Sequence, residues 1–151
     1  MQPKHHPKLH PGQAVPKWSS SLSVGNAKLD EQHITLLELG RDLIRLLHTD
    51  TATEAQIHGA LEDIVKLSQL HDALEESTLE TNGCPTLAEH TVVHQAARAK
   101  LASLLADVSR STAERAVSSD LIAQWMNHHI SENDLPVKGY LKHVSPPRAA
   151  A

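Results

Sequence analysis

Apolar residues recur three to four positions apart along four segments of the chain, which is the spacing of one face of an α-helix. The first segment runs from Asp30 to His48, and Asp30 is its expected N-cap. Its apolar positions are Ile34, Leu37, Leu43, Ile44 and Leu47. No segment shows the alternation of apolar and polar residues that is typical of a half-buried strand. The pattern therefore predicts an all-α protein.

Three further segments carry the same helical pattern. They cover Thr53 to Thr81, Thr86 to about Val108, and Thr112 to Ser131, with a short turn around Lys138 to His143. The second should stop at Asn82-Gly83, since glycine favours helix ends. The fourth should end before Pro136, which disfavours helix at the residue preceding it. The expected inward positions are Ile57, Leu61, Ile64, Val65, Leu67, Leu70 and Leu74; His90, Val93, His94, Ala97, Leu101, Leu104 and Leu105; and Val117, Leu121, Ile122 and Trp125.

Helix length and short connections predict how these segments assemble. A helix of about twenty residues spans about 30 Å, and short connections favour antiparallel neighbours. The sequence thus predicts an up-down-up-down antiparallel four-helix bundle. A chain of 151 residues has room for one such domain. We expect a tail over residues 1–17, the domain over 18–143 and a second tail over 144–151.

Composition narrows the possible functions. Only 2% of the residues are aromatic and none is Phe, so the core should be aliphatic. The formal charge is −4 without a long Lys/Arg stripe, which argues against nucleic acid or an anionic membrane as partner. No apolar run approaches a secretion signal or a membrane span, which predicts a cytoplasmic protein. Cys84 is the only cysteine, so an internal disulfide and a thiolate-rich zinc site are excluded.

Histidine and carboxylate side chains fall on the inward faces of the expected helices. His71 and Glu75 are four residues apart, as are His90 and His94. Residues four apart lie about one helical turn apart on the same side, so each pair can chelate a metal ion. The remaining two helices offer His33 and His129 in the same way.

Asp134 is a further candidate ligand, five residues after His129. On a continuous α-helix this spacing would place it about 140° round the axis from His129. We expect Asp134 to reach the site only if the helix ends there, which Pro136 favours.

These seven side chains suit two metal ions rather than one. Imidazole and carboxylate ligands without thiolate favour iron, while manganese, zinc and cobalt stay possible by ligand chemistry alone. A single inward histidine is usually a core residue, but seven such groups in one aliphatic bundle would be costly to bury without a cation. The other histidines, His5, His6, His10, His48, His58 and His128, are expected in solvent, with metal scavenging by His5, His6 and His10 as the alternative. Glu76 is also expected in solvent, with support of a ligand as the alternative, and Cys84 is expected to be an ordinary thiol, with redox activity as the alternative.

Four spaced motifs resemble those of the hemerythrin family, in the same order along the chain. They are Asp30-Glu-Gln-His33, His71-Asp-Ala-Leu-Glu75-Glu76, His90-Thr-Val-Val-His94 and Trp125-Met-Asn-His-His129-Ile-Ser-Glu-Asn-Asp134. The resemblance covers about residues 18–143. It implies two non-haem iron ions bridged by an oxo or hydroxo group.

The resemblance also implies a role for each ligand. His90, His94 and His129 would bind one iron, His33 and His71 the other, and Glu75 and Asp134 would bridge them. The second iron would keep an open position for dioxygen or another small diatomic ligand. This predicts a non-enzymatic protein for oxygen storage, transport or sensing. The alternatives are an enzyme that handles peroxide or nitric oxide, and a redox or oxygen sensor that acts through a protein partner.

The chain departs from the family pattern beside the expected ligands. Asp72 and Ala97 stand where the family usually has Phe, and Cys84 stands where it often has Tyr. Leu74, Leu79, Val93, Leu121 and Trp125 are expected to keep the pocket apolar. A smaller wall admits more water and should speed oxidation of the iron to an inert state.

Overall fold

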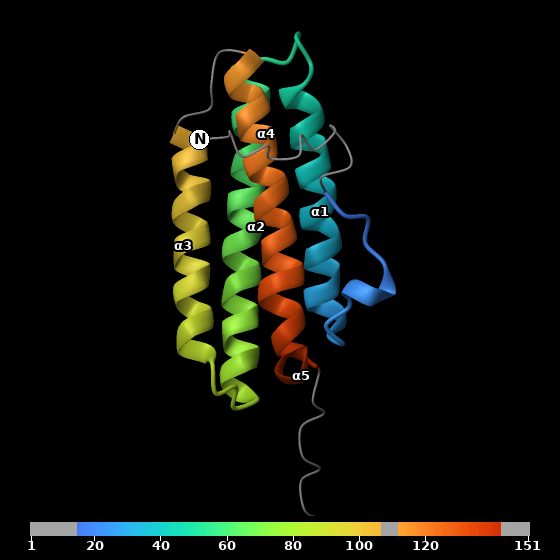
Figure 1. The fold of residues 1–151 in the computed structure, drawn as a ribbon, viewed down its shortest axis with the longest axis vertical. Helices are drawn as coiled ribbons and strands as arrows, with labels where there is room; N and C mark the ends of the chain where they lie inside the picture. Colours follow the sequence, from blue (N-terminus) through green and yellow to red (C-terminus); the bar gives the residue numbers. More distant parts are fainter. Residues whose placement is uncertain (1–14, 107–111, 143–151) are drawn as a thin grey trace, which may run out of the picture.

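The computed structural model of the chain describes residues 15–106 and 112–142, and four long α-helices make up most of it. These are α1 (Ala27–Leu47), α2 (Glu54–Thr81), α3 (Leu87–Ala106) and α4 (Thr112–Asn127). They lie side by side, and the chain direction reverses from each helix to the next (Figure 1). No strand occurs in the described ranges. The predicted all-α four-helix bundle is confirmed.

The start of α1 differs from the prediction that Asp30 caps it. Asn26 is the N-cap, and its side chain accepts a hydrogen bond from the Leu29 amide. Asp30 instead lies in the first turn, where its carboxylate accepts hydrogen bonds from Ser23 Oγ at 2.5 Å and from the Val24 amide at 2.9 Å. Acidic residues are favourable in a first turn because they face the positive end of the helix dipole. Asp30 therefore stabilises the helix start without capping it.

Both ends of α2 follow their sequence signals. Thr53 and Gln56 form a reciprocal capping box at its start. At its end, the Gly83 amide donates to the Glu80 carbonyl and the Cys84 amide to the Leu79 carbonyl, which is a Schellman motif. Gly83 has a φ of 68°, a conformation that glycine adopts without strain. The predicted end at Asn82-Gly83 is confirmed.

Helical structure continues after α4 beyond the predicted end at Ser131. A π-helix, η2, spans His128–Asp134, followed by the 3₁₀ turn η3 (Leu135–Val137) and the short helix α5 (Lys138–Leu141). The Leu135 amide donates to the Ile130 carbonyl, five residues earlier. Pro136 falls within η3, so the chain turns there rather than at Ser131.

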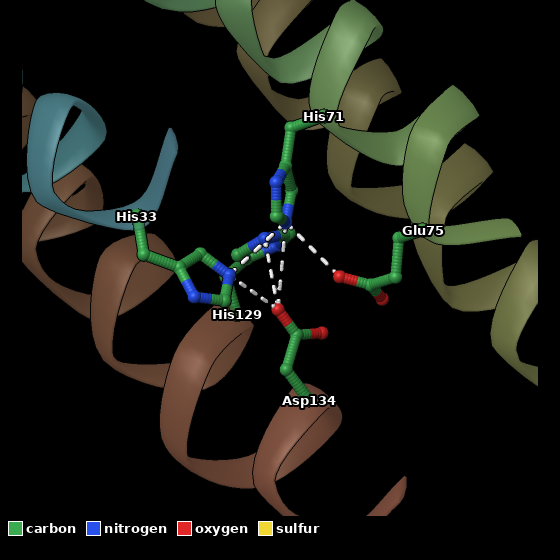
Figure 2. A group of neighbouring side chains, drawn as sticks. All are labelled: His33, His71, Glu75, His129 and Asp134. Atoms are coloured by element: carbon green, nitrogen blue, oxygen red, sulfur yellow. Dashed lines mark hydrogen bonds and ion pairs between the residues drawn. The ribbon is translucent and has the colours of Figure 1, made fainter. Parts of the chain in front are cut away.

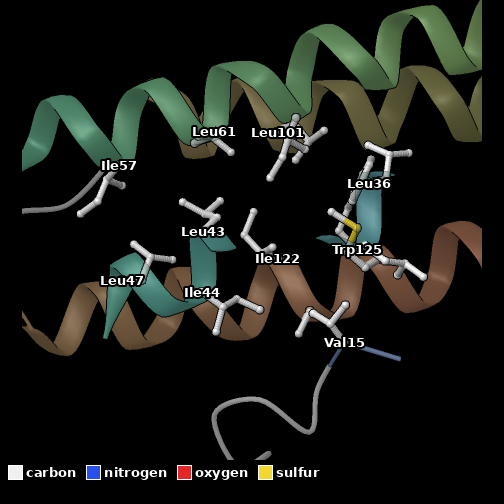
Figure 3. Close-up of a cluster of buried hydrophobic side chains, with 14 of the residues drawn as sticks. Val15, Leu36, Leu43, Ile44, Leu47, Ile57, Leu61, Leu101, Ile122 and Trp125 are labelled. Atoms are coloured by element: carbon white, nitrogen blue, oxygen red, sulfur yellow. The ribbon is translucent and has the colours of Figure 1, made fainter. Parts of the chain in front are cut away.

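A large aliphatic cluster fills the bundle toward the connection between α1 and α2 (Figure 3). Its members include Leu36, Leu43, Leu47, Ile57, Leu61, Leu101, Ile122 and Met126, all nearly inaccessible to solvent. Helices α1 and α4 approach closely here, because a Cβ on Gly40 would lie 2.9 Å from Met126 Cε. Val15 also belongs to this cluster, three residues before the predicted domain start at residue 18. Residues 1–14 of the first predicted tail, residue 143 of the predicted domain and the second predicted tail, 144–151, lie outside the described ranges.

A smaller aliphatic cluster lies at the opposite end of the bundle, next to α5. It consists of Val24, Leu29, Leu79, Cys84 and Leu141. Along α1, His33 falls between Leu29 of this cluster and Leu36 of the larger one. A layer of buried polar side chains thus separates two apolar layers.

Four predicted inward positions are wrong, because their side chains are exposed. These are Leu70, Val93, Val117 and Leu121. Leu70 lies one residue before His71, and neighbours on a helix point about 100° apart, so both cannot face the interior. No described helix is long and apolar enough to span a membrane.

Candidate metal centre

The seven predicted ligand residues meet in the polar layer. His33 comes from α1, His71 and Glu75 from α2, His90 and His94 from α3, and His129 and Asp134 from η2. None exposes more than 6% of its surface. Figure 2 shows five of them directed at a common point between the helices. The structure therefore brings together all seven side chains.

The π-helix places Asp134 in this layer beside His129. A π-helix has hydrogen bonds between residues five apart, so residues at that spacing lie on one face. The π-helix η2 ends at Asp134, as the prediction of a helix end at this residue requires, but the prediction did not include the π-helix itself, which continues directly from α4. A local widening of the helix turns this carboxylate inward.

Glu75 lies between two groups of imidazoles. One group is His33, His71 and His129, and the other is His90 and His94. Its Oε1 accepts hydrogen bonds from His90 Nε2 and, at 3.1 Å, from His94 Nε2, while its Oε2 lies 3.0 Å from His71 Nε2. Burial alone would raise the pKa of Glu75, but the hydrogen bonds from these imidazoles outweigh it and hold the pKa well below its usual range. Glu75 is therefore ionised at neutral pH.

Asp134 faces both groups from the opposite side. Its Oδ2 lies 2.7 Å from His33 Nε2 and 3.3 Å from His129 Nε2, and its Oδ1 lies 3.6 Å from His90 Nε2. Burial and the nearby charge of Glu75 raise the pKa of Asp134 well above its usual range, against the opposing effect of His33. Each carboxylate thus directs one oxygen to each group of imidazoles.

Two of the imidazoles have shifted pKa values in opposite directions. Burial and the neighbouring His71 charge lower the pKa of His129 well below its usual value, which keeps this ring neutral. Burial would also lower the pKa of His94, but its hydrogen bond to Glu75 and the charge of Asp72 raise it to about 9. Without a cation in the layer, a proton therefore occupies His94 at neutral pH.

The donor set leaves several buried atoms unsatisfied. Glu75 Oε2, His129 Nε2 and Asp134 Oδ1 have no hydrogen-bond partner of good geometry in the part of the chain that the structure describes. His33 Nε2 and His71 Nε2 lie only 3.0 Å apart, and a pair of ring nitrogens can share only one proton at that distance. Buried lone pairs without a donor are costly, and a divalent cation satisfies them. The residues present therefore fit metal ions.

Candidate ligand atoms form two overlapping groups. One combines His33, His71 and His129 with both carboxylates, and the other combines His90 and His94 with the same two carboxylates. Within each group all donor atoms lie within 4.8 Å of one another. His129 also forms a third group with Asp72 and His94, so it lies between the two histidine pairs. Its assignment to the same iron as His90 and His94 stays a prediction.

Two polar residues orient the rings; the sequence indicated this role only as the alternative for Glu76 and not for Gln32. Gln32 Oε1 accepts a hydrogen bond from His71 Nδ1 at 2.8 Å, and Glu76 Oε1 accepts one from His94 Nδ1 at 3.2 Å. A proton held on Nδ1 leaves Nε2 free to bind a metal. The expectation that Glu76 is only solvated is wrong, since it is half-buried against His94. Both contacts cross between helices, so spacing along one helix gives no signal for them.

Asp72 is buried next to the same layer. Its Oδ2 accepts a hydrogen bond from Arg98 Nη1 at 3.0 Å, and its Oδ1 lies 3.6 Å from His94 Nε2. Burial raises the pKa of Asp72, although the charges of His94, His71 and Arg98 oppose the rise. A charged pair, Asp72 and Arg98, therefore lies directly beside the polar layer.

A pocket of about 480 Å³ lies between α3 and α4 and reaches the polar layer at His129. Val93, Ala97, Leu121 and Trp125 form its apolar wall, and the Trp125 ring stacks on His129 with ring centroids 5.3 Å apart. Leu79, one of the expected wall residues, belongs instead to the small aliphatic cluster near α5, and Leu74, another, packs against that cluster. The pocket is partly open, because Val93 and Leu121 are exposed.

The remaining side chains expected in solvent mostly lie there. His48, His58 and His128 are exposed, and His128 pairs with Glu132. Cys84 is a buried free thiol in the small aliphatic cluster. His5, His6 and His10 lie outside the described residues.

Buried imidazoles arranged around two shared carboxylates define a cation-binding four-helix bundle. The chain belongs to the hemerythrin family, since residues 24–141 match the hemerythrin HHE cation binding domain. It is 31% identical to a myohemerythrin of Riftia pachyptila over 124 residues, which are 82% of this chain and 92% of that protein. It is 25% identical to a bacteriohemerythrin of Stenotrophomonas maltophilia (strain R551-3) over 122 residues, 78% of this chain and 75% of that protein. No solved structure matches the chain significantly.

Proposed function

We propose that the chain holds two iron ions in this layer and binds dioxygen reversibly at them, as a carrier, store or sensor rather than an enzyme. The observation that carries this proposal is the position of Glu75 and Asp134, each of which directs one oxygen to each group of imidazoles. A carboxylate in this position is suited to be a ligand that two ions share. The names of the two relatives support iron and oxygen over other metals and ligands.

The ligand set favours binding over oxidation. When bound, the pair of iron ions supplies reversible two-electron chemistry to a diatomic ligand. Five imidazoles and only two shared carboxylates donate less negative charge than a carboxylate-rich site, which disfavours highly oxidised metal. By resemblance, His90, His94 and His129 hold one ion, and His33 and His71 the other. The ion at His33 and His71 would then have fewer protein ligands and would be the one that accepts dioxygen.

The surrounding residues prepare the layer for this role. Gln32 and Glu76 hold protons on the outer nitrogens of His71 and His94, so the inner nitrogens face the ions. Trp125 covers one face of His129 and limits access of water from the pocket. The two aliphatic clusters enclose the polar layer from both ends of the bundle.

Iron analysis combined with an oxygenation cycle tests the proposal. Protein purified after growth with ample iron should contain two irons per chain. The reduced protein should gain a visible absorption band under oxygen, and the starting spectrum should return when oxygen is removed. A chain without transition metal, or a spectrum that never returns, would contradict the proposal.

The open pocket favours a second candidate function, turnover of hydrogen peroxide or nitric oxide. A pocket of about 480 Å³ that ends at His129 is larger than a diatomic ligand needs, and it admits water and reductants. Steady-state consumption of either compound with a reductant, abolished by Glu75→Ala, would support this function. Uptake limited to one equivalent per site would reject it.

A further inference from the structure

Asp72 is a buried carboxylate beside the metal centre and is not one of the seven ligands. Its side chain is only 4% exposed. Arg98, which is 34% exposed, donates to Oδ2 at 3.0 Å and fixes the outer oxygen. The other oxygen, Oδ1, lies 3.6 Å from His94 Nε2. The two oxygens thus serve different partners, a cation at the edge of the bundle and an imidazole of the polar layer.

A second observation is that a ring nitrogen near Asp72, His129 Nε2, is able to bind a metal ion. An oxygen of Asp72 and ring nitrogens of His94 and His129 lie within 4.8 Å of one another. His129 Nε2 is buried and has no hydrogen-bond partner among the residues that the structure describes. Three donors at this spacing, one of them unsatisfied, have the arrangement that a divalent cation fills.

We propose that Asp72 is a third carboxylate ligand of the metal centre, which donates Oδ1 to an ion held by His94 and His129, with Arg98 as its positioning residue. The inference rests on the proposed function, because it requires metal in the layer. It adds an eighth protein donor to the seven and separates this chain from relatives with an aromatic ring at that position, since such a ring cannot ligate.

Arg98 makes a third buried carboxylate tolerable. A lone buried carboxylate would be costly, whereas the guanidinium compensates its charge and holds its outer oxygen. A ligand that is anchored in this way keeps its position before the ion arrives. An additional anionic donor also occupies one coordination position and favours the more highly charged state of the ion. The proposal therefore fills one more coordination position of the ion at His94 and His129 and leaves the ion at His33 and His71 unchanged.

Anaerobic cobalt(II) titration of the full chain tests the proposal, with chelator competition for affinity and visible absorption for coordination. Asp72→Asn keeps the shape of the side chain but is a weak donor. We expect it to bind one of two cobalt ions at least tenfold more weakly, with an altered absorption band because one oxygen donor is lost. Arg98→Gln should weaken binding of that ion by a few-fold. Asp63→Asn, a change at an exposed position of α2, the helix of Asp72, should change neither the affinity nor the absorption.

The outcomes separate this inference from the proposed function. If Asp72→Asn and Asp63→Asn both bind two cobalt ions with equal affinity and spectra, Asp72 is not a ligand, while the proposed function stands. If the unmutated chain binds no cobalt, both are overturned. Asp72→Leu, which fills the space without an oxygen, provides a second test should the Asn variant unfold. Retained binding in the Leu variant would likewise overturn the inference.

Discussion

The large aliphatic cluster and the polar layer are both buried in the same bundle, but they meet opposite requirements. Leu43, Ile57 and Ile122 pack in one cluster of apolar side chains, and their burial stabilises the fold whether or not a ligand binds. The polar layer keeps buried oxygen and nitrogen atoms unsatisfied among the described residues. The aliphatic cluster therefore provides stability and the polar layer provides binding, so substitutions should separate the two properties.

Glu75→Ala should have the largest effect, because it removes the carboxylate that faces both groups of imidazoles. We expect iron content to fall from two per chain to nearly none, a loss in affinity of roughly a hundredfold or more. Metal analysis of the purified variant measures this. Glu62→Ala, an exposed change on α2, is the matched control and should keep both irons. Full iron content in Glu75→Ala would mean that the layer does not depend on a shared carboxylate.

Leu43→Ala should destabilise the aliphatic cluster without emptying the polar layer. Truncation of a buried leucine costs about 2 to 5 kcal/mol, and Leu43 is 1% exposed. Urea unfolding measures the loss, and metal analysis should still find iron at the unmutated level. Leu70→Ala, at a position 66% exposed, should change the free energy of unfolding by less than about 0.5 kcal/mol. Loss of iron in a folded Leu43→Ala variant would erase the distinction between the layers.

Metal affinity should depend on pH through His94. Its pKa of about 9 means that a metal must displace a proton from this ring at neutral pH. Cobalt affinity should therefore fall by about tenfold for each pH unit below 9, and more steeply if Asp134 also loses a proton. Glu76→Gln removes one contact that raises this pKa, so its profile should shift to lower pH. An affinity that is flat from pH 7 to pH 9 would contradict this prediction.

The metal-free protein should show the opposite dependence in its stability. A histidine whose pKa is raised in the folded state stabilises that state below its unfolded value, and this contribution is lost as pH rises through about 9. The free energy of unfolding measured at pH 8 and at pH 10 checks the sign.

Ala97→Phe should have the smallest effect of these substitutions, because it changes only access to the polar layer. A phenyl ring in the pocket between α3 and α4 would restore the wall beside Trp125 and exclude water. We expect oxidation of the reduced protein in air to slow by a few-fold, with unchanged iron content. Ala99→Phe, at an exposed position outside the pocket lining, is the control. Equal oxidation rates for the two variants would show that the open wall does not control access.

Helical periodicity predicted the four helices and six of the seven side chains of the polar layer, whereas Asp134 was predicted from an expected helix end. The pairs His71 and Glu75, and His90 and His94, needed only the helix geometry of one segment. Periodicity failed where the helix is not regular, since the widened turn of η2 could not be inferred from spacing. It also misplaced the start of α1, because Asn26, one turn before the predicted cap Asp30, is the N-cap.

Contacts between helices could not be predicted from the sequence for a different reason. The bonds from His71 to Gln32 and from Arg98 to Asp72 depend on how two helices are rotated against each other. That rotation follows from the packing of many side chains at once, and no local spacing encodes it. The prediction that Leu121 faces inward failed for the same reason, because α3 and α4 leave a pocket at the position where we expected continuous packing.

The π-helix has a consequence for motion in this bundle. Helical turns of this type are rare, and η2 carries His129 and Asp134 at one end of α4 with little aliphatic packing of its own beyond Ile130. Segments with few apolar contacts open locally at low free energy. A ligand that ties both residues to the other three helices would close this segment, so amide exchange at residues 128–134 should report occupancy of the site more sensitively than exchange in the middle of α1.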